Sequence, residues 1–180
     1  MKVLSRLKSV SDVKDWWEMT DDEHAFFWKT MPNFERNFNR ELFDSIEKAE
    51  RYVKDVEKQA DQFFRKEEQI LKEGKKLPSG EKFYNQRKDE FNYELKRAHI
   101  LIDLFNSVDV GDSVEKTIDK LKSAFKNREI SNVYDFSPED FKAQYDKYFE
   151  KKSNAHTVKL DGLLDFYLVF RDGELINRYF

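Results

Sequence analysis

The chain of 180 residues contains no cysteine, only five glycines and only three prolines. Without cysteine, a disulfide-stabilised fold and any thiolate zinc site or thiol nucleophile are excluded. No glycine-rich phosphate-binding loop and no G-x-S-x-G nucleophile elbow is present. No apolar run approaches the roughly 20 residues of a membrane-spanning helix. We therefore expect a soluble, cytoplasmic protein without a catalytic site, a cofactor or a bound metal.

Aromatic and charged residues are abundant instead. The chain has 17 Phe, 8 Tyr and 3 Trp, and this apolar surface is sufficient to fill a core. Charged residues make up 38% of the chain, but the formal net charge is only −3. A balance of this kind gives no chain-wide attraction to nucleic acid, so any such binding requires a local basic patch.

The middle of the chain has the apolar spacing of two packed helices. Between residues 46 and 70 the apolar positions follow alternating steps of three and four, which predicts one helix over residues 34–73. A second series with the same spacing predicts a returning helix over residues 81–106. Gly74 is a candidate cap for the first helix. Together these segments predict a long, coiled-coil-like antiparallel hairpin with its tip near residues 74–81.

The last third of the chain changes from a helical period to a strand period. Asp112 with Glu115, and then Ser137-Pro138, are start signals for two shorter helices. Alternating apolar residues then predict strands over 157–160, 163–170 and 174–180, separated by Asp-Gly pairs that favour two-residue hairpin turns. We expect a three-stranded antiparallel meander with Leu164, Phe166, Leu168 and Phe170 on its buried face.

These elements predict an α+β protein, predominantly helical, that forms one domain over residues 1–180. Within it we expect four parts in chain order: aromatic and acidic N-terminal helices over 1–32, the helical hairpin over 33–106, two helices over 107–156 and the meander over 157–180.

The N-terminal part is a candidate surface for a protein partner. Between residues 11 and 24 six acids stand against one lysine, and several large aromatics lie in the same region. Most of these aromatics have the helical spacing of core residues, and acids are also common at helix starts. Phe26 is the exception, because it points away from the face that His24, Phe27, Trp28 and Met31 share. The candidate partner-binding residues are Asp12, Asp15, Trp17, Asp21, Asp22, Glu23 and Phe26.

The hairpin tip has the opposite charge. From Arg65 to Lys88 eight bases stand against four acids. Phosphate groups of nucleic acid, phospholipid or polyphosphate would be attracted to such a surface, although charged helix exteriors are common without any ligand. The candidate anion-binding residues are Lys72, Lys75, Lys76, Lys82, Arg87 and Lys88.

Three functions remain open at this point. The leading hypothesis is a non-enzymatic protein-binding module, such as an adaptor, inhibitor or effector, that uses the hairpin or the acidic, aromatic N-terminus. The second is a binder of phosphorylated ligands at the basic tip. The third is a homo-oligomer, in which the apolar seam pairs between chains and Glu67 fixes its register.

Overall fold

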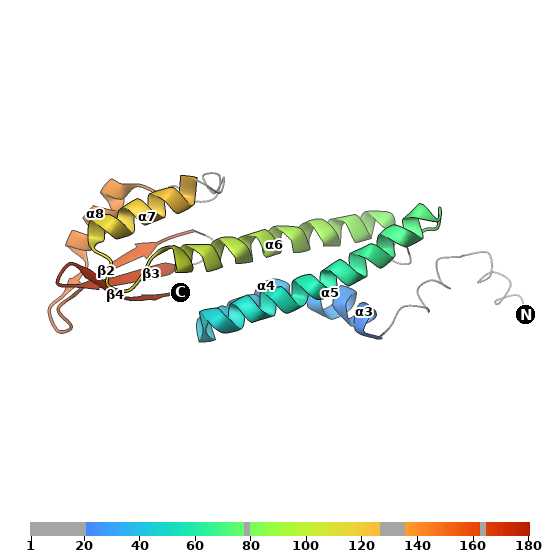
Figure 1. Ribbon diagram of the computed structural model, residues 1–180, viewed down its shortest axis with the longest axis horizontal. Coiled ribbons are helices and arrows are strands. Elements are labelled where there is room, and N and C mark those ends of the chain that lie inside the picture. The colour runs from blue at the N-terminus through green and yellow to red at the C-terminus, as the bar shows by residue number, and fades with distance from the viewer. Residues whose placement is uncertain (1–20, 78–79, 127–135, 163–164) are drawn as a thin grey trace, which may run out of the picture. The chain divides into compact units, whose positions relative to one another are not determined.

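The computed structural model describes residues 21–77, 80–126, 136–162 and 165–180 (Figure 1). It confirms the α+β class, with most of the described chain helical and a C-terminal antiparallel sheet. The helices are α3 (Asp21–Ala25), the π-helix η1 (Phe26–Thr30), α4 (Phe34–Asp44), α5 (Ile46–Lys72), α6 (Glu81–Ser107), α7 (Val114–Lys126) and α8 (Pro138–Lys147). The strands are β1 (Phe149–Glu150), β2 (Ala155–Leu160), β3 (Phe166–Arg171) and β4 (Glu174–Tyr179).

The chain divides into two compact units. Among the described residues, the helical unit comprises 21–41, 47–77 and 80–96, and the sheet unit comprises 42–46, 97–126, 136–162 and 165–180. Helix α6 contributes its first part to the helical unit and its last part to the sheet unit.

In the helical unit the prediction of one helix over residues 34–73 is wrong, because α4 and α5 are separate helices with Ser45 between them. The Phe34 ring stacks on the Tyr52 ring at 5.7 Å. In a straight helix, 18 residues would place these side chains about 27 Å apart, so α4 folds back along α5. This reversal buries Phe34 and Phe38, which one continuous rod would leave exposed to water.

The predicted tip of the hairpin is confirmed. Helix α5 ends in a Schellman motif: the amide of Lys75 donates to the Ile70 carbonyl at 3.2 Å, and the amide of Gly74 donates to the Leu71 carbonyl at 3.0 Å. Gly74 has a φ of 74°, a conformation that glycine adopts without a Cβ clash. The α5 seam is also buried as predicted, at Ala49, Val53, Val56, Ala60, Phe63, Glu67 and Ile70.

The sheet has four strands in the order β1-β2-β3-β4, all antiparallel, and the expected count of three is corrected. The additional strand β1 is only two residues long, pairing Phe149 with His156. A segment this short cannot show the alternation by which strands are recognised in a sequence. The hairpin at Asp172-Gly173 is confirmed, because both residues have positive φ, at 52° and 78°.

Helices α7 and α8 cover one face of the sheet (Figure 1). Helix α8 begins as predicted, with the Ser137 hydroxyl accepting a hydrogen bond from the Asp140 amide at 3.2 Å. Phe141 of α8 packs edge-to-face on Phe170 of β3 at 6.0 Å. The predicted inward face is confirmed at Phe166, Leu168 and Phe170, which are all buried, and Leu164 lies outside the described residues.

Candidate functional site

The described residues include only part of the predicted acidic, aromatic N-terminus. Asp12, Asp15 and Trp17 lie outside the described residues. Asp21 and Asp22 begin α3. Glu23 forms an ion pair with Lys66 of α5 at 2.8 Å, and this ion pair links α3 to α5. The role of the acids in partner binding stays a prediction.

Phe26 was expected to point away from the neighbouring aromatic face, and this expectation is wrong. Its side chain is 1% exposed and contacts Phe63 at 5.4 Å and Phe91 at 5.6 Å. Phe26 is the first residue of the π-helical turn, in which the Met31 amide donates to the Phe26 carbonyl at 2.8 Å. A turn closed from i to i+5 is wider than an α-helical turn and rotates the later side chains. Phe26 therefore belongs to the core.

The same turn exposes Trp28. Its side chain is 51% exposed, and its ring stacks on the ring of Phe83 in the first turn of α6, at 6.1 Å and an interplanar angle of 29°. Phe83 is itself 39% exposed. We call Trp28 and Phe83 the tip aromatic pair, because Phe83 lies just after the loop that joins α5 and α6.

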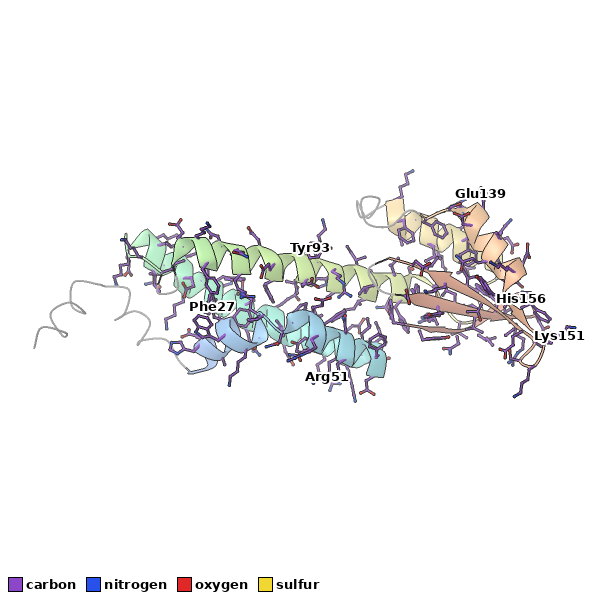
Figure 2. All side chains as sticks on the ribbon, turned by 180° about the vertical axis from the view of Figure 1, so that it is seen from behind. Phe27, Arg51, Tyr93, Glu139, Lys151 and His156 are labelled. Carbon is purple, nitrogen blue, oxygen red and sulfur yellow. The ribbon has the colours of Figure 1, made fainter. Side chains whose placement is uncertain are left out.

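The tip aromatic pair packs on a buried aromatic core. Phe27, labelled in Figure 2, contacts Trp28 edge-to-face at 4.9 Å and Phe83 at 6.0 Å. Phe27 is fully buried and stacks on Phe63 of α5 at 5.7 Å and on Tyr84 of α6 at 6.3 Å. The exposed pair is thus the outer layer of a core contributed by η1, α5 and α6.

Some of the predicted anion-binding residues already interact with an acid or an aromatic ring of the chain, and others do not. Lys75 pairs with Glu73 at 2.9 Å, and Arg87 pairs with Glu90 at 3.2 Å. Lys88 lies over the Phe64 ring, with Nζ 4.8 Å from the ring centroid. Within the described residues, no ion pair involves the three remaining bases, all exposed: Lys72, Lys76 and Lys82.

A buried carboxylate lies close to the same core. Glu67 is 2% exposed, and its Oε1 atom has no hydrogen-bond partner in the described part of the chain. Burial, reinforced by the negative charge of Glu23 and opposed by Lys66, raises the pKa of Glu67 to about 7. The pKa of the Tyr84 hydroxyl is also raised, by burial and then by the charge of Glu67.

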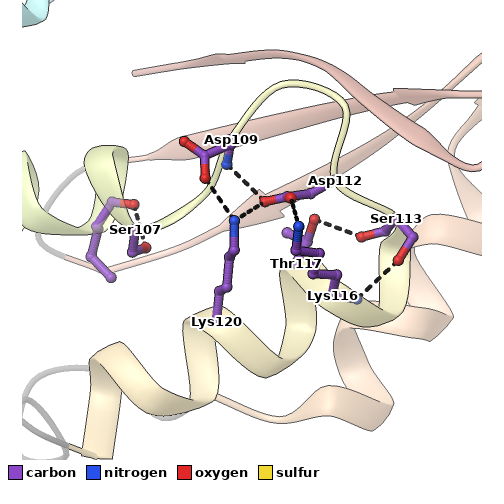
Figure 3. A network of polar contacts seen from close by, with 8 residues as sticks. Ser107, Asp109, Asp112, Ser113, Lys116, Thr117 and Lys120 are labelled. Carbon is purple, nitrogen blue, oxygen red and sulfur yellow. Dashed lines mark hydrogen bonds and ion pairs between the residues drawn. The ribbon is translucent and has the colours of Figure 1, made fainter.

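The sheet unit contains a separate polar network (Figure 3). Lys120 of α7 donates to the carboxylates of both Asp109 and Asp112, and Lys116 pairs with Asp112 at 3.0 Å. The Asp112 side chain also accepts a hydrogen bond from the Asp109 amide at 2.9 Å. Burial works to raise the pKa of Asp112, but these donors outweigh it and hold the pKa at about 2.

This network borders an open cleft of about 870 Å³ between the end of α6 and α7. The lining includes Ser107 from α6 and Lys116, Asp119 and Lys120 from α7. Both lysines already pair with Asp112. The network therefore fixes the loop between the two helices, and its charges are compensated without a ligand.

Neither a metal site nor a membrane-spanning helix is found among the described residues. No group of three or more metal-ligating side chains is placed to hold an ion. No described helix is both long and apolar enough to cross a membrane. Comparisons of the chain with protein-family models, with curated proteins and with solved structures give no match.

Sequence reasoning missed the tip aromatic pair, because Trp28 has the α-helical spacing of a core residue and no sequence signal marks a π-turn. It considered Glu67 only as the residue that would fix the register of a seam paired between chains. It read Asp112 as a helix cap, whereas the Ser113 hydroxyl accepts from the Lys116 amide at 3.2 Å. The spacing of four residues between Asp112 and Lys116 was the available signal for the ion pair.

Proposed function

We propose that this chain is a non-enzymatic protein-binding module and that its contact surface is centred on the tip aromatic pair. The observation that carries the proposal is the exposure of two stacked aromatic rings from different helices, Trp28 and Phe83. Large aromatic side chains contribute a dominant share of binding energy at protein interfaces. Exposing such rings costs hydration free energy, and a partner that covers them recovers it.

The support beneath the pair favours tight binding. Phe27 contacts both rings and is itself fixed against α5 and α6 through Phe63 and Tyr84. Rings that are already held in place lose little conformational freedom when a partner binds, so less of the contact energy is spent on ordering them.

The alternative, a binder of phosphorylated ligands at the basic tip, has less support. Lys75 and Arg87 pair with glutamates, and Lys88 lies over an aromatic ring. A phosphate group carries a concentrated negative charge, and a protein binds it with several donors that point to the same place. At the tip only separated lysines remain without ion pairs among the described residues.

The proposal is tested by capture from a native lysate of the source cells with the immobilised full chain, and with a double variant carrying Trp28→Ala and Phe83→Ala. We expect a stoichiometric protein partner whose affinity falls by about 30-fold or more in the double variant, since one interface hot spot contributes about 2 kcal/mol or more.

The matched control is Tyr93→Ala, which removes another exposed aromatic ring of α6. Circular dichroism and urea midpoints establish that each variant is folded. Partners bound equally well by the double variant and the original chain would contradict the proposal.

A further inference from the structure

We infer that the partner presents an acidic protein segment around an apolar anchor, with the anchor on the tip aromatic pair and its carboxylates on the flanking bases. This inference rests on the proposed function and adds the chemical class of the partner. The argument is one of charge complementarity between the tip and the segment that covers it.

Bases are the chain neighbours of the two rings. Lys29 follows Trp28 and Lys82 precedes Phe83 in the chain, and both lysines are exposed. Neither forms an ion pair within the described residues. The guanidinium of Arg87, which pairs with Glu90, lies 5.4 Å from the centre of the Phe83 ring.

The acids near this end of the helical unit offset the flanking lysines only in part. Glu23 is paired with Lys66, Glu73 with Lys75 and Glu90 with Arg87. Glu81 lies in the first turn of α6, where the helix dipole opposes its charge. Lys29 and Lys82 remain as exposed ammonium groups, each next in the chain to one ring of the tip aromatic pair.

This arrangement favours an acidic protein over a nucleic acid. A nucleobase stacks on a free aromatic face, but the Phe83 ring already stacks on Trp28 and lies beside the Arg87 guanidinium. A phosphate backbone is followed by a continuous basic groove, whereas Lys75 and Lys88 at this end are already engaged. Carboxylates spaced around an apolar side chain match the separated lysines.

The test measures binding of the full chain to short fluorescein-labelled peptides by fluorescence anisotropy. All peptides contain a central Trp-Leu anchor, flanked by glutamates, by serines or by lysines, and a labelled oligothymidylate represents nucleic acid. We expect the glutamate-flanked peptide to bind at least about tenfold more tightly than the serine-flanked peptide at low salt, with the difference shrinking as salt rises.

Charge variants assign this preference to the flanking bases. The double variant Lys29→Glu and Lys82→Glu should lose the preference for glutamates and keep its affinity for the serine-flanked peptide. Lys122→Glu with Lys142→Glu, two exposed lysines of the sheet unit, makes the same change in net charge and should keep the preference. Trp28→Ala with Phe83→Ala should weaken binding of both peptides.

Four outcomes would overturn the inference: equal binding of the three peptides, preference for lysine flanks, tighter binding of the oligothymidylate, or no binding of any peptide. A partner captured from lysate through the tip aromatic pair would still leave the proposed function standing in each case. A lysate partner that binds the double variant without Trp28 and Phe83 as well as it binds the original chain would contradict the proposed function itself. The two failures are therefore distinguishable.

Discussion

At the scale of single residues, Glu67 occupies a position that is costly for a carboxylate. An apolar residue would continue the α5 seam, yet this position holds a carboxylate that is almost fully buried. The groups that face it are Glu23 of α3, Lys66 of α5 and Tyr84 of α6. Only Lys66 favours its ionised form, and Lys66 is already paired with Glu23.

The stability of the protein should therefore fall as Glu67 ionises. The pKa of its carboxyl is about 7 in the folded chain against an ordinary value of 4.5. Between these values the folded chain binds the proton more strongly than the unfolded chain, so this contribution to stability is complete below about pH 4.5 and is lost as pH rises to about 7.

Glu67→Gln should remove this pH dependence, because the amide does not ionise. We expect the variant to unfold at higher urea than the original chain at pH 8, by up to about 3 kcal/mol at about 1.4 kcal/mol per pKa unit, with the gain shrinking toward pH 5. Urea titrations at several pH values measure this change. Glu68→Gln, at an exposed neighbour, is the control, and a parallel pH profile for both variants would refute the assignment.

At the scale of elements, the π-turn of η1 determines which aromatic rings are available. It places Phe26 and Phe27 together in the core and turns Trp28 outward. A regular α-helix would instead group Phe27 with Trp28 and Met31 on one face. The proposed contact surface therefore depends on one wide turn of five residues.

Several strand amides in the sheet donate to groups other than the backbone carbonyls of a neighbouring strand. The Lys159 amide of β2 donates to the Gln144 side chain of α8 at 3.0 Å. In β4, the Leu175 amide donates to the Asp112 carbonyl at 2.8 Å, and the Arg178 amide donates to the Asn177 side chain at 2.9 Å. Amides that are already bonded offer less of a template for pairing with another chain.

Asp112 contacts two elements. Its backbone carbonyl accepts a hydrogen bond from the Leu175 amide of β4, and its carboxylate pairs with Lys116 and Lys120 of α7. Asp112→Asn should lower the free energy of unfolding by about 3 kcal/mol, because it leaves Lys116 and Lys120 without their shared counter-charge. Thermal and urea unfolding at neutral pH measure the loss. The control is Asp119→Asn on the exposed side of α7, which should change stability by less than about 0.5 kcal/mol; equal losses would contradict this role for Asp112.

At the scale of the whole molecule, the two compact units have separate cores. Phe63 belongs to the aromatic core of the helical unit, with Phe26 and Phe27 around it. Leu168 belongs to the core formed by the sheet with α7 and α8. A cavity in either core should first weaken the unit that contains it.

Phe63→Ala and Leu168→Ala test this separation. Each should cost about 3 to 5 kcal/mol as a cavity in a packed core. Hydrogen exchange followed by mass spectrometry should show faster exchange in residues 47–72 for the first variant and in residues 155–179 for the second. An equal rise in both units for either variant would show that the chain unfolds as one cooperative body.

The sequence by itself determined what depends on local chemistry. The Gly74 cap, the Ser137-Pro138 helix start, the Asp-Gly turn at 172–173 and the buried face of β3 all follow from residue type and period. These are short-range preferences, and the structure confirms each of them.

The tertiary structure alone decided what depends on partners distant in sequence. The break at Ser45, the wide turn that buries Phe26, and the stacking of Trp28 on Phe83 have no local signal. Each reflects how much apolar surface the chain can bury once α3 to α6 pack together, and that gain outweighs the regular geometry of a single helix. The candidate contact surface belongs to this second group, because its two rings are 55 positions apart in the chain.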